Sequence, residues 1–360
     1  MRDPRLKHYN VQEMRCKRLF TITTLFLLFL PGSSAAVWQP SQARTIANID
    51  FFGYGQLDVV KLRSVLPIQP GDSIEQSDWS AYPSRIDQAI RSLTRKPVTD
   101  VVRLCCDENR NSMVYIGVAG ASTVALQHKA TPNGKERLPA AALKLNQEAE
   151  DALRKAVVAG HTQQDNSNGY SLSADPDLRA IELKTREFAL ANEDLLRKIL
   201  SSSADAEHRA IAAEFLGYVN VSAHQIADLT DAARDPDEGV RNNAVRALGV
   251  IASSSPDRAR MIRPKPFIAL LKSDKWVDRN KGAWLLINLT QSRDPKFLKQ
   301  LRREAMDALV EMARWHFAGH ASMARRLLGR IAGLEESKLD ALVTQNDQAE
   351  TIIAAAQKSP

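Results

Sequence analysis

The chain has 360 residues, enough for two or three domains, and its 44% hydrophobic and 25% charged residues are ordinary for a globular protein. The formal net charge is +7, but residues 1–36 carry six cations against two acids and so supply four of those charges. The remaining +3 is too small to indicate nucleic-acid binding, and we expect no nucleic-acid partner.

The first 36 residues have the features of an export signal. A basic stretch ends at Arg18, an uncharged apolar run extends from Leu19 to Leu30, and small residues then lead to Ala36. A helix of this run would span about 18 Å, less than the roughly 30 Å hydrocarbon core of a bilayer. We therefore predict an exported protein, periplasmic or secreted, that is cleaved near Ala36 and keeps no membrane span. An uncleaved N-terminal anchor is the alternative.

Residues 44–120 predict a compact module that mixes strands and helices. Runs of apolar and β-branched residues indicate strands at 45–52, 98–106 and 113–119. Apolar residues at three-to-four spacing indicate helices at 57–66 and 79–93. The predicted order is therefore strand, helix, helix, strand, strand.

This order resembles that of a POTRA domain. The resemblance covers residues 44–120 and includes three short stretches, Ile49-Asp50-Phe51-Phe52-Gly53, Gly71-Asp72 and Val114-Tyr115-Ile116-Gly117-Val118. It implies a module of an exported Gram-negative bacterial protein that recognises extended polypeptide by adding a strand to its sheet.

Two cysteines, Cys105 and Cys106, lie next to each other at the end of the second predicted strand. Neighbouring side chains of a strand point to opposite faces, so we expect two small core residues rather than a disulfide. A disulfide between them would need a turn at this position and is the alternative.

Residues 121–177 are predicted to be a linker with one helix. The helix is expected at 139–159, because Pro139 suits a first turn and Gly160 suits a position just past the end. The polar residues 161–176 show no periodicity and predict an exposed, mobile segment.

From residue 178 onward the sequence is helical and repetitive. The first copy of its pattern reads Asp205, Arg209, Ala212, Leu216 and Gly217, and the second, with the same spacing, reads Asp237, Arg241, Ala244, Leu248 and Gly249. A third copy keeps Arg279 and Leu286, and a fourth keeps Ala324, Leu328 and Gly329. A pattern that recurs in this way along the chain indicates a solenoid, in which each unit buries its apolar face against the next.

The repeats resemble HEAT repeats, and more closely the short bacterial kind, over residues 178–355. The second copy carries the resemblance best, with Asp235-Pro236-Asp237 followed by Arg241, Ala244 and Leu248-Gly249. The resemblance implies pairs of antiparallel helices that stack on one another. The predicted fold is thus an α+β N-terminal domain followed by an all-α HEAT-like solenoid.

Two sets of residues recur in register in the repeats. We interpret the first as structural, the aspartates capping helices and the arginines bridging to the next repeat: Asp205, Arg209, Asp237, Arg241 and Arg279. A binding ladder for an anionic ligand is the alternative. The second set is our candidate for partner binding, with a solvated helix face as the alternative: Asn242, Asn243, Asn280 and Lys281.

Aromatic and histidine residues in the last two repeats suggest further chemistry. Trp276, Trp284 and Trp315 are expected to pack between helices, although a solvent-facing cluster would favour glycan or peptide stacking. His316 and His320 are four residues apart and could share a helix face, but no cysteine or carboxylate stands at matching local spacing. We therefore expect no metal site.

Catalytic motifs are absent from the sequence, so we predict no enzyme activity and no cofactor. The predicted function is a non-catalytic protein-binding scaffold of the cell envelope, which binds partners on the solenoid surface and on the N-terminal sheet edge. The alternative is a carbohydrate-binding or envelope structural protein. The sequence leaves the partner and the oligomeric state open.

Overall fold

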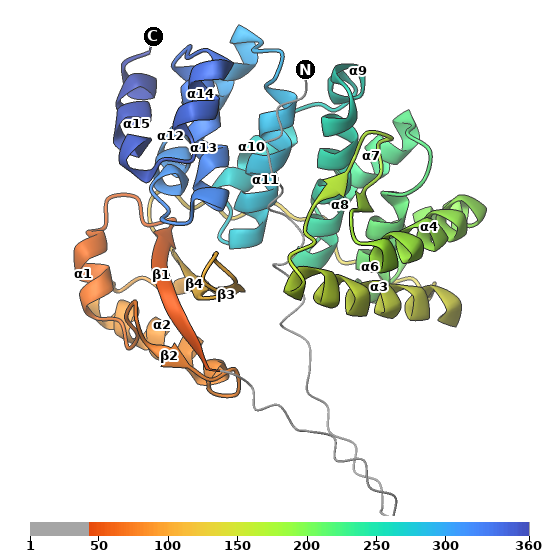
Figure 1. Cartoon of the computed structure of the whole chain (residues 1–360), viewed down its shortest axis with the longest axis horizontal. Coiled ribbons are helices and arrows are strands. Elements are labelled where there is room, and N and C mark those ends of the chain that lie inside the picture. Colours follow the sequence, from red (N-terminus) through yellow and green to blue (C-terminus); the bar gives the residue numbers. More distant parts are fainter. Residues whose placement is uncertain (1–42, 360) are drawn as a thin grey trace, which may run out of the picture.

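The structure is a computed structural model that describes residues 43–359. The export signal predicted at residues 1–36, with its cleavage near Ala36, lies outside the described residues. Figure 1 shows a small sheet-containing module beside a row of helices, with the module packed under α12 and α13.

The N-terminal module contains one sheet. Its strands are β1 (Arg44–Phe52), β2 (Ser73–Ile74), β3 (Val98–Cys105) and β4 (Ser112–Val118), in the spatial order β2-β1-β4-β3. β1 runs parallel to β4, and β3 is antiparallel to β4. The helical elements are α1 (Val59–Ser64), the 3-10 turn η1 (Asp78–Ala81) and α2 (Tyr82–Thr94). The predicted order of strands and helices is confirmed, and the two-residue β2 is an addition.

Both faces of this sheet are covered. Ile49, Val114 and Ile116 face α1 and α2 and belong to the core of the module. Phe52 and Tyr115, on the opposite face, belong to the core of the helical region. Because side chains alternate along a strand, β4 can be buried at every position only if something packs on each of its faces. The module and the helices that follow therefore share one core.

The remainder of the described chain is helical apart from the extended residues 121–138 and one small hairpin. Its helices are α3 (Ala140–Val158), α4 (Pro176–Ala191), α5 (Glu193–Ser202), α6 (Ala206–Leu216), α7 (Ala223–Ala232), α8 (Glu238–Ser254), α9 (Pro256–Arg260), α10 (Lys265–Ile268), η2 (Ala269–Lys272), α11 (Trp276–Leu289), α12 (Pro295–Ala313), α13 (Ala318–Ile331), α14 (Glu336–Leu342), η3 (Asn346–Gln348) and α15 (Ala349–Lys358). None of the described helices is long and apolar enough to cross a membrane.

These helices form consecutive antiparallel pairs. We call α6, α8, α11 and α13 the second helices, because each follows the first helix of its pair. The second helices α6, α8 and α11 pack closely against one another along the row, whereas first helices of neighbouring pairs, α5 with α7 and α10 with α12, touch only a little. Closer spacing on one side bends a solenoid toward that side, so the second helices lie on its inner face.

Residues 121–177 connect the module to the repeats and contact both. Residues 121–138, which we call the strap, run in an extended path from the module to α3, and α3 pairs with α4. The expected mobile segment forms the hairpin β5 (Gln164–Asp165) and β6 (Leu172–Ser173). This hairpin packs on the repeats, because Arg186 stacks on Tyr170 and Glu182 accepts a hydrogen bond from the Ser173 backbone. The single helix predicted at 139–159 is present as α3.

Candidate protein-binding surfaces

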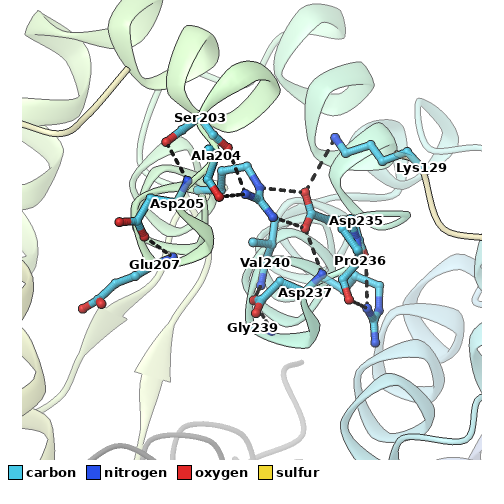
Figure 2. Close-up of polar contacts among 12 residues, drawn as sticks. Lys129, Ser203, Ala204, Asp205, Glu207, Asp235, Pro236, Asp237, Gly239 and Val240 are labelled. Carbon is cyan, nitrogen blue, oxygen red and sulfur yellow. Dashed lines mark hydrogen bonds and ion pairs between the residues drawn. The ribbon is translucent and has the colours of Figure 1, made fainter. Parts of the chain in front are cut away.

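A ladder of buried ion pairs joins each repeat to the next. Arg209 donates two hydrogen bonds to Asp235 at 3.0 and 2.8 Å, and Arg241 donates two to Asp278 at 2.9 and 2.8 Å. Asp235, which accepts the first two of these bonds, is labelled in Figure 2. The arginines also donate to the loop carbonyls just before their own helices, so their donors are used inside the protein. They are therefore not available as a ladder for an anionic ligand.

The aspartates of the repeat pattern have a different role from the arginines. Asp205 and Asp237 cap α6 and α8, because each side chain accepts hydrogen bonds from two backbone N–H groups of the first turn. Neither binds the arginine of its own repeat pattern. The repeat pattern does not identify the carboxylates that bind the arginines, which are Asp235, Asp278 and Glu311. Asp235 could have been found, because it stands in the Asp-Pro-Asp stretch that marks the second repeat.

Asp278 stabilises the charged form of the buried Arg241 side chain. Burial alone would lower the pKa of Arg241, but the hydrogen bonds and the negative charge of Asp278 raise this pKa above its usual value. The hydroxyl of Ser273 donates a further hydrogen bond to Asp278 at 2.7 Å. This second rung is thus a charged pair with additional hydrogen bonds in the interior.

The third rung connects the ladder to the N-terminal module. Arg279 donates to Glu311 at 3.1 Å, and both side chains are buried. The same carboxylate accepts hydrogen bonds from the backbone N–H groups of Gly53 and Gly55 at 2.7 and 2.8 Å, and from the Ser122 hydroxyl. Gly53 and Gly55 have φ of 75° and 58°, a conformation that suits glycine. Glu311 therefore holds the turn after β1 against the repeats.

The tryptophans and histidines fill the interface between module and repeats. Trp276 and Trp315 are each 1% exposed, and both pack against Tyr115 of β4. The Trp315 side chain donates to the Phe51 carbonyl. These two rings therefore do not form the exposed strip that would favour glycan stacking. Trp284 is partly buried and packs on Gly249 of the preceding repeat.

The two histidines have separate partners in the module. His316 contacts Asp50 through both its backbone N–H, at 2.9 Å, and its Nδ1, at 2.6 Å. His320 forms a hydrogen bond with the Tyr115 hydroxyl at 2.6 Å. Among the residues that the structure describes, no group of three or more histidines, cysteines or acids could hold a metal ion.

The four residues predicted to bind a partner lie mostly inside the protein. Asn242, Asn280 and Lys281 are 5%, 0% and 2% exposed, so these side chains do not stand on a surface. The expectation that they would be accessible overlooked the extent to which neighbouring helices enclose α8 and α11. Asn243 is half-buried and donates to the Ala210 carbonyl and to Glu214.

Asn243 belongs to a polar strip on the inner face. Glu214 on α6 and Arg246 on α8 are also half-buried, and Arg246 donates to Gln164 of the hairpin at 3.3 Å. We call Glu214, Asn243 and Arg246 the inner strip. It presents an acid, an amide and a cation along two neighbouring second helices, which suits polar contacts with a polypeptide.

The sheet has one edge strand without a strand partner in the described chain. β3 pairs with β4 on one side only. Its start touches the repeats, where Lys275 donates to the Thr99 carbonyl and Asp100 accepts from the Trp276 N–H. At its other end Cys105 and Cys106 are half-buried rather than enclosed in the core, and their sulfur atoms lie against each other. The strand ends at Cys105, and the alternation that predicted diverging side chains does not extend to Cys106.

The strap occupies the edge of the solenoid formed by the loops before α6, α8 and α11, which we call the loop edge. Backbone N–H groups of Val124, Lys129 and Gly134 donate to the carbonyls of Lys272, Arg234 and Ser202, respectively, at 2.7 to 2.9 Å. These carbonyls are equivalent, because each stands seven residues before the arginine of its repeat. The strap thus crosses one repeat for every five of its own residues. It runs from the loop before α11 back to the loop before α6, opposite to the chain order of the repeats.

Side-chain contacts of the strap are few. Lys129 lies 3.0 Å from Asp231 and 3.9 Å from Asp235, as Figure 2 shows for the latter, and Arg137 lies 3.0 Å from Asp205. Most other side chains between 121 and 138 are exposed or half-buried. The repeats therefore hold the strap mainly by its backbone.

Comparison with known proteins identifies the repeats. The family model of HEAT repeats matches residues 193–279, from α5 into α11. These residues are HEAT repeats. The predicted fold, a mixed sheet with helices followed by an all-helical HEAT-like region, is thereby confirmed.

Three of the solved structures similar to this chain are engineered proteins. A computationally designed armadillo repeat protein for modular peptide recognition shares 16% identity over 51% of this chain and 93% of its own, with a TM-score of 0.33. A designed armadillo repeat protein in complex with a (KR)4 peptide shares 18% identity over 61% and 97%, with a TM-score of 0.35. Another engineered protein shares 19% over 51% and 90%, with a TM-score of 0.36. These overlaps are too loose to support a functional argument, and no curated protein matches the chain.

Proposed function

We propose that this protein is a non-catalytic scaffold that binds other proteins. The observation that carries the proposal is the row of HEAT repeats at 193–279, whose inner face presents the inner strip to solvent. Solenoids of this kind offer an extended preformed surface, so a partner can bind at several points without the protein changing shape.

The inner strip is the surface that we propose for the main contact. The loop edge is filled by the strap, and the module covers the loops before α11 and α13. Half-buried polar groups at the centre of a patch contribute more to binding than fully exposed ones, because a partner can exclude water from them. Arg246 is the best candidate anchor, since arginine is enriched among residues that dominate binding energy.

A capture experiment tests the inner strip. The chain from residue 37 is used as bait in extract, beside a variant carrying Glu214→Lys and Arg246→Glu. We expect the wild-type chain to capture a partner that the variant loses. A matched control, Lys184→Glu with Glu187→Lys on the exposed side of α4, should keep it. Equal capture by all three chains contradicts the proposal.

We also propose the cell envelope as the location, on the basis of the sequence of residues 1–36. The basic stretch, apolar run and small residues before Ala36 support export. Fractionation of cells, with N-terminal sequencing of the purified protein, tests this. A mature protein that begins near residue 37 outside the cytoplasm supports it, whereas an intact N-terminus in the cytoplasm contradicts it.

The resemblance of the module to POTRA domains suggests β3 as a second contact, by strand addition. An edge strand has unpaired backbone groups that an extended peptide can bind. In the captured complex, backbone N–H groups at alternate positions of β3 should exchange with solvent more slowly than in the free chain. Unchanged exchange along β3 would exclude strand addition.

A further inference from the structure

The repeats bind the backbone of the strap at regularly spaced positions, as a peptide-binding protein binds an extended peptide. Three backbone N–H groups, five residues apart, reach three equivalent carbonyls in consecutive repeats. The regular spacing follows from the repeat itself, because each repeat presents the same carbonyl once. A site that reads backbone groups in this way accepts an extended polypeptide without requiring a particular sequence at most positions.

The fit is close at Gly134 and open at Val124. At Gly134 an added Cβ would lie 2.5 Å from the Ser202 carbonyl oxygen, so the backbone of the strap approaches this loop more closely than a side chain allows. The Val124 side chain, in contrast, is 44% exposed. Lys129 adds the main side-chain contact, with Asp231 and Asp235.

The ends of the strap are held differently from its middle. Ser122 at one end is buried against Glu311, and the Leu138 backbone at the other end donates to His208 at 2.7 Å. Between them, few apolar side chains are buried, and Leu126 is the one that packs on the shared core. Segments with little buried apolar surface open at a lower free-energy cost than the core.

We propose that the loop edge is a polypeptide-binding site, and that residues 124–134 of the strap are its built-in, exchangeable occupant. The external ligand is an extended segment of a partner protein, with a lysine facing Asp231 and Asp235 and a glycine five residues later. The strap competes with this ligand from within the same chain, so it regulates access. This inference rests on the proposed function, but it concerns the loop edge rather than the inner strip.

A peptide-binding experiment tests the proposal. Residues 124–134 are replaced in the otherwise full mature chain by a glycine-serine segment of equal length with proline at 124, 129 and 134, which removes the three backbone donors. Circular dichroism and thermal melting establish that this chain is folded. The probe is a fluorescein-labelled peptide of residues 121–138, and fluorescence anisotropy measures its binding. We expect saturable binding to the replaced chain and about tenfold or more weaker binding to the intact chain, since the tethered strap is present at high effective concentration.

Modified peptides separate backbone recognition from simple charge attraction. N-methylation at Val124, Lys129 and Gly134 removes the three donors and should abolish binding, and Gly134→Ala should weaken it strongly. Equal binding of the N-methylated peptide, or no binding by the folded replaced chain, overturns the proposal. The inner strip is unaltered in these chains, so partner capture that persists while peptide binding fails would refute the loop edge alone.

A second measurement applies if the replaced chain does not fold. In the intact chain, hydrogen exchange of the Val124, Lys129 and Gly134 backbone N–H groups is compared with that of α8. Exchange of the strap that is faster than global unfolding supports an exchangeable segment. Exchange at the rate of global unfolding means that the strap leaves only when the protein unfolds, and this contradicts the proposal.

Discussion

His316 joins the repeats to the N-terminal module through a charged hydrogen bond. Its Nδ1 lies 2.6 Å from the buried Asp50 carboxylate, whose hydrogen bond raises the pKa of His316 above its ordinary value. The folded state therefore binds this proton more tightly than the unfolded state. The stabilisation is fully present below about pH 6.5 and is lost as the pH rises through the raised pKa.

The first prediction follows from the raised pKa of His316, which makes its contribution to stability fall as the pH rises. Urea unfolding at pH 5.5 and pH 8.5 should show a smaller difference between the two pH values in His316→Gln than in the wild-type chain. His224→Gln, on an exposed position of α7, is the control and should leave the difference unchanged. A pH dependence that is the same in His316→Gln and wild type would contradict the role of Asp50.

Glu182 differs from His316, because its surroundings disfavour the charged form of its side chain. Burial against the hairpin raises its pKa to about 7, although the Ser173 N–H partly offsets this effect. The folded state holds the proton up to higher pH than the unfolded state, so the contribution of Glu182 to stability falls as the pH rises from about 4.5 to about 7.

The second prediction is that Glu182→Gln makes the protein less sensitive to pH in that range. The difference between the two pKa values corresponds to about 3 kcal/mol, as an upper limit. At pH 8 the variant should unfold at a higher urea concentration than wild type, and at pH 4.5 the two should be similar. A variant that is less stable at pH 8 would show that the carboxylate is stabilising when charged.

At the scale of the elements, the arginine ladder determines how the second helices stack. The side chain of Arg241 on α8 binds Asp278 at the start of α11, and both side chains are at most 3% exposed. Removing one partner leaves the other charge buried without compensation.

The third prediction is therefore that Arg241→Met destabilises the protein by roughly 3 to 5 kcal/mol. The double variant Arg241→Met/Asp278→Asn should recover part of this loss, because no buried charge is left unpaired. Arg260→Met, which breaks an exposed pair with Asp257, should change the unfolding free energy by less than about 1 kcal/mol. If Arg241→Met also lowered the unfolding free energy by less than about 1 kcal/mol, the Arg241–Asp278 pair would contribute little to stability.

The sequence predicted the elements better than their surroundings. Apolar spacing located α2 and β4, and the repeat pattern located the arginines of α6, α8 and α11. It did not predict that Asn280 and Lys281 would be buried, because α11 is enclosed by neighbours distant in sequence.

The path of the strap was beyond prediction for a related reason. Residues 121–138 are polar and without periodicity, and backbone hydrogen bonds to distant loops leave no pattern in side chains. The hairpin at 161–176 was missed in the same way, because its order depends on contacts with α4 and α8 rather than on its own composition.

At the scale of the whole molecule, the module, the strap and the repeats form a single unit. Gly53 is the point where they meet: an added Cβ would lie 2.0 Å from the Thr123 hydroxyl and 2.6 Å from the Val118 carbonyl oxygen. Its φ of 75° is already unfavourable for other residues.

The fourth prediction compares two glycines. Gly53→Ala should lower the unfolding free energy by about 2 kcal/mol more than Gly71→Ala. Gly71 also has a positive φ, 99°, but nothing lies within 4 Å of its added Cβ, so the control has the backbone strain without the steric contact. Equal losses in the two variants would mean that the turn after β1 is not pressed against the strap.

The central claim is that this molecule binds a partner protein on the inner face of its repeats. Site-specific photo-crosslinking in cells tests it most directly, with a photoreactive residue in place of Arg246 on the inner strip or, in a second chain, in place of Lys184 on the exposed side of α4. We predict a discrete crosslinked protein from position 246 and none from position 184. Crosslinking from position 184 alone, or none from position 246, would contradict the claim.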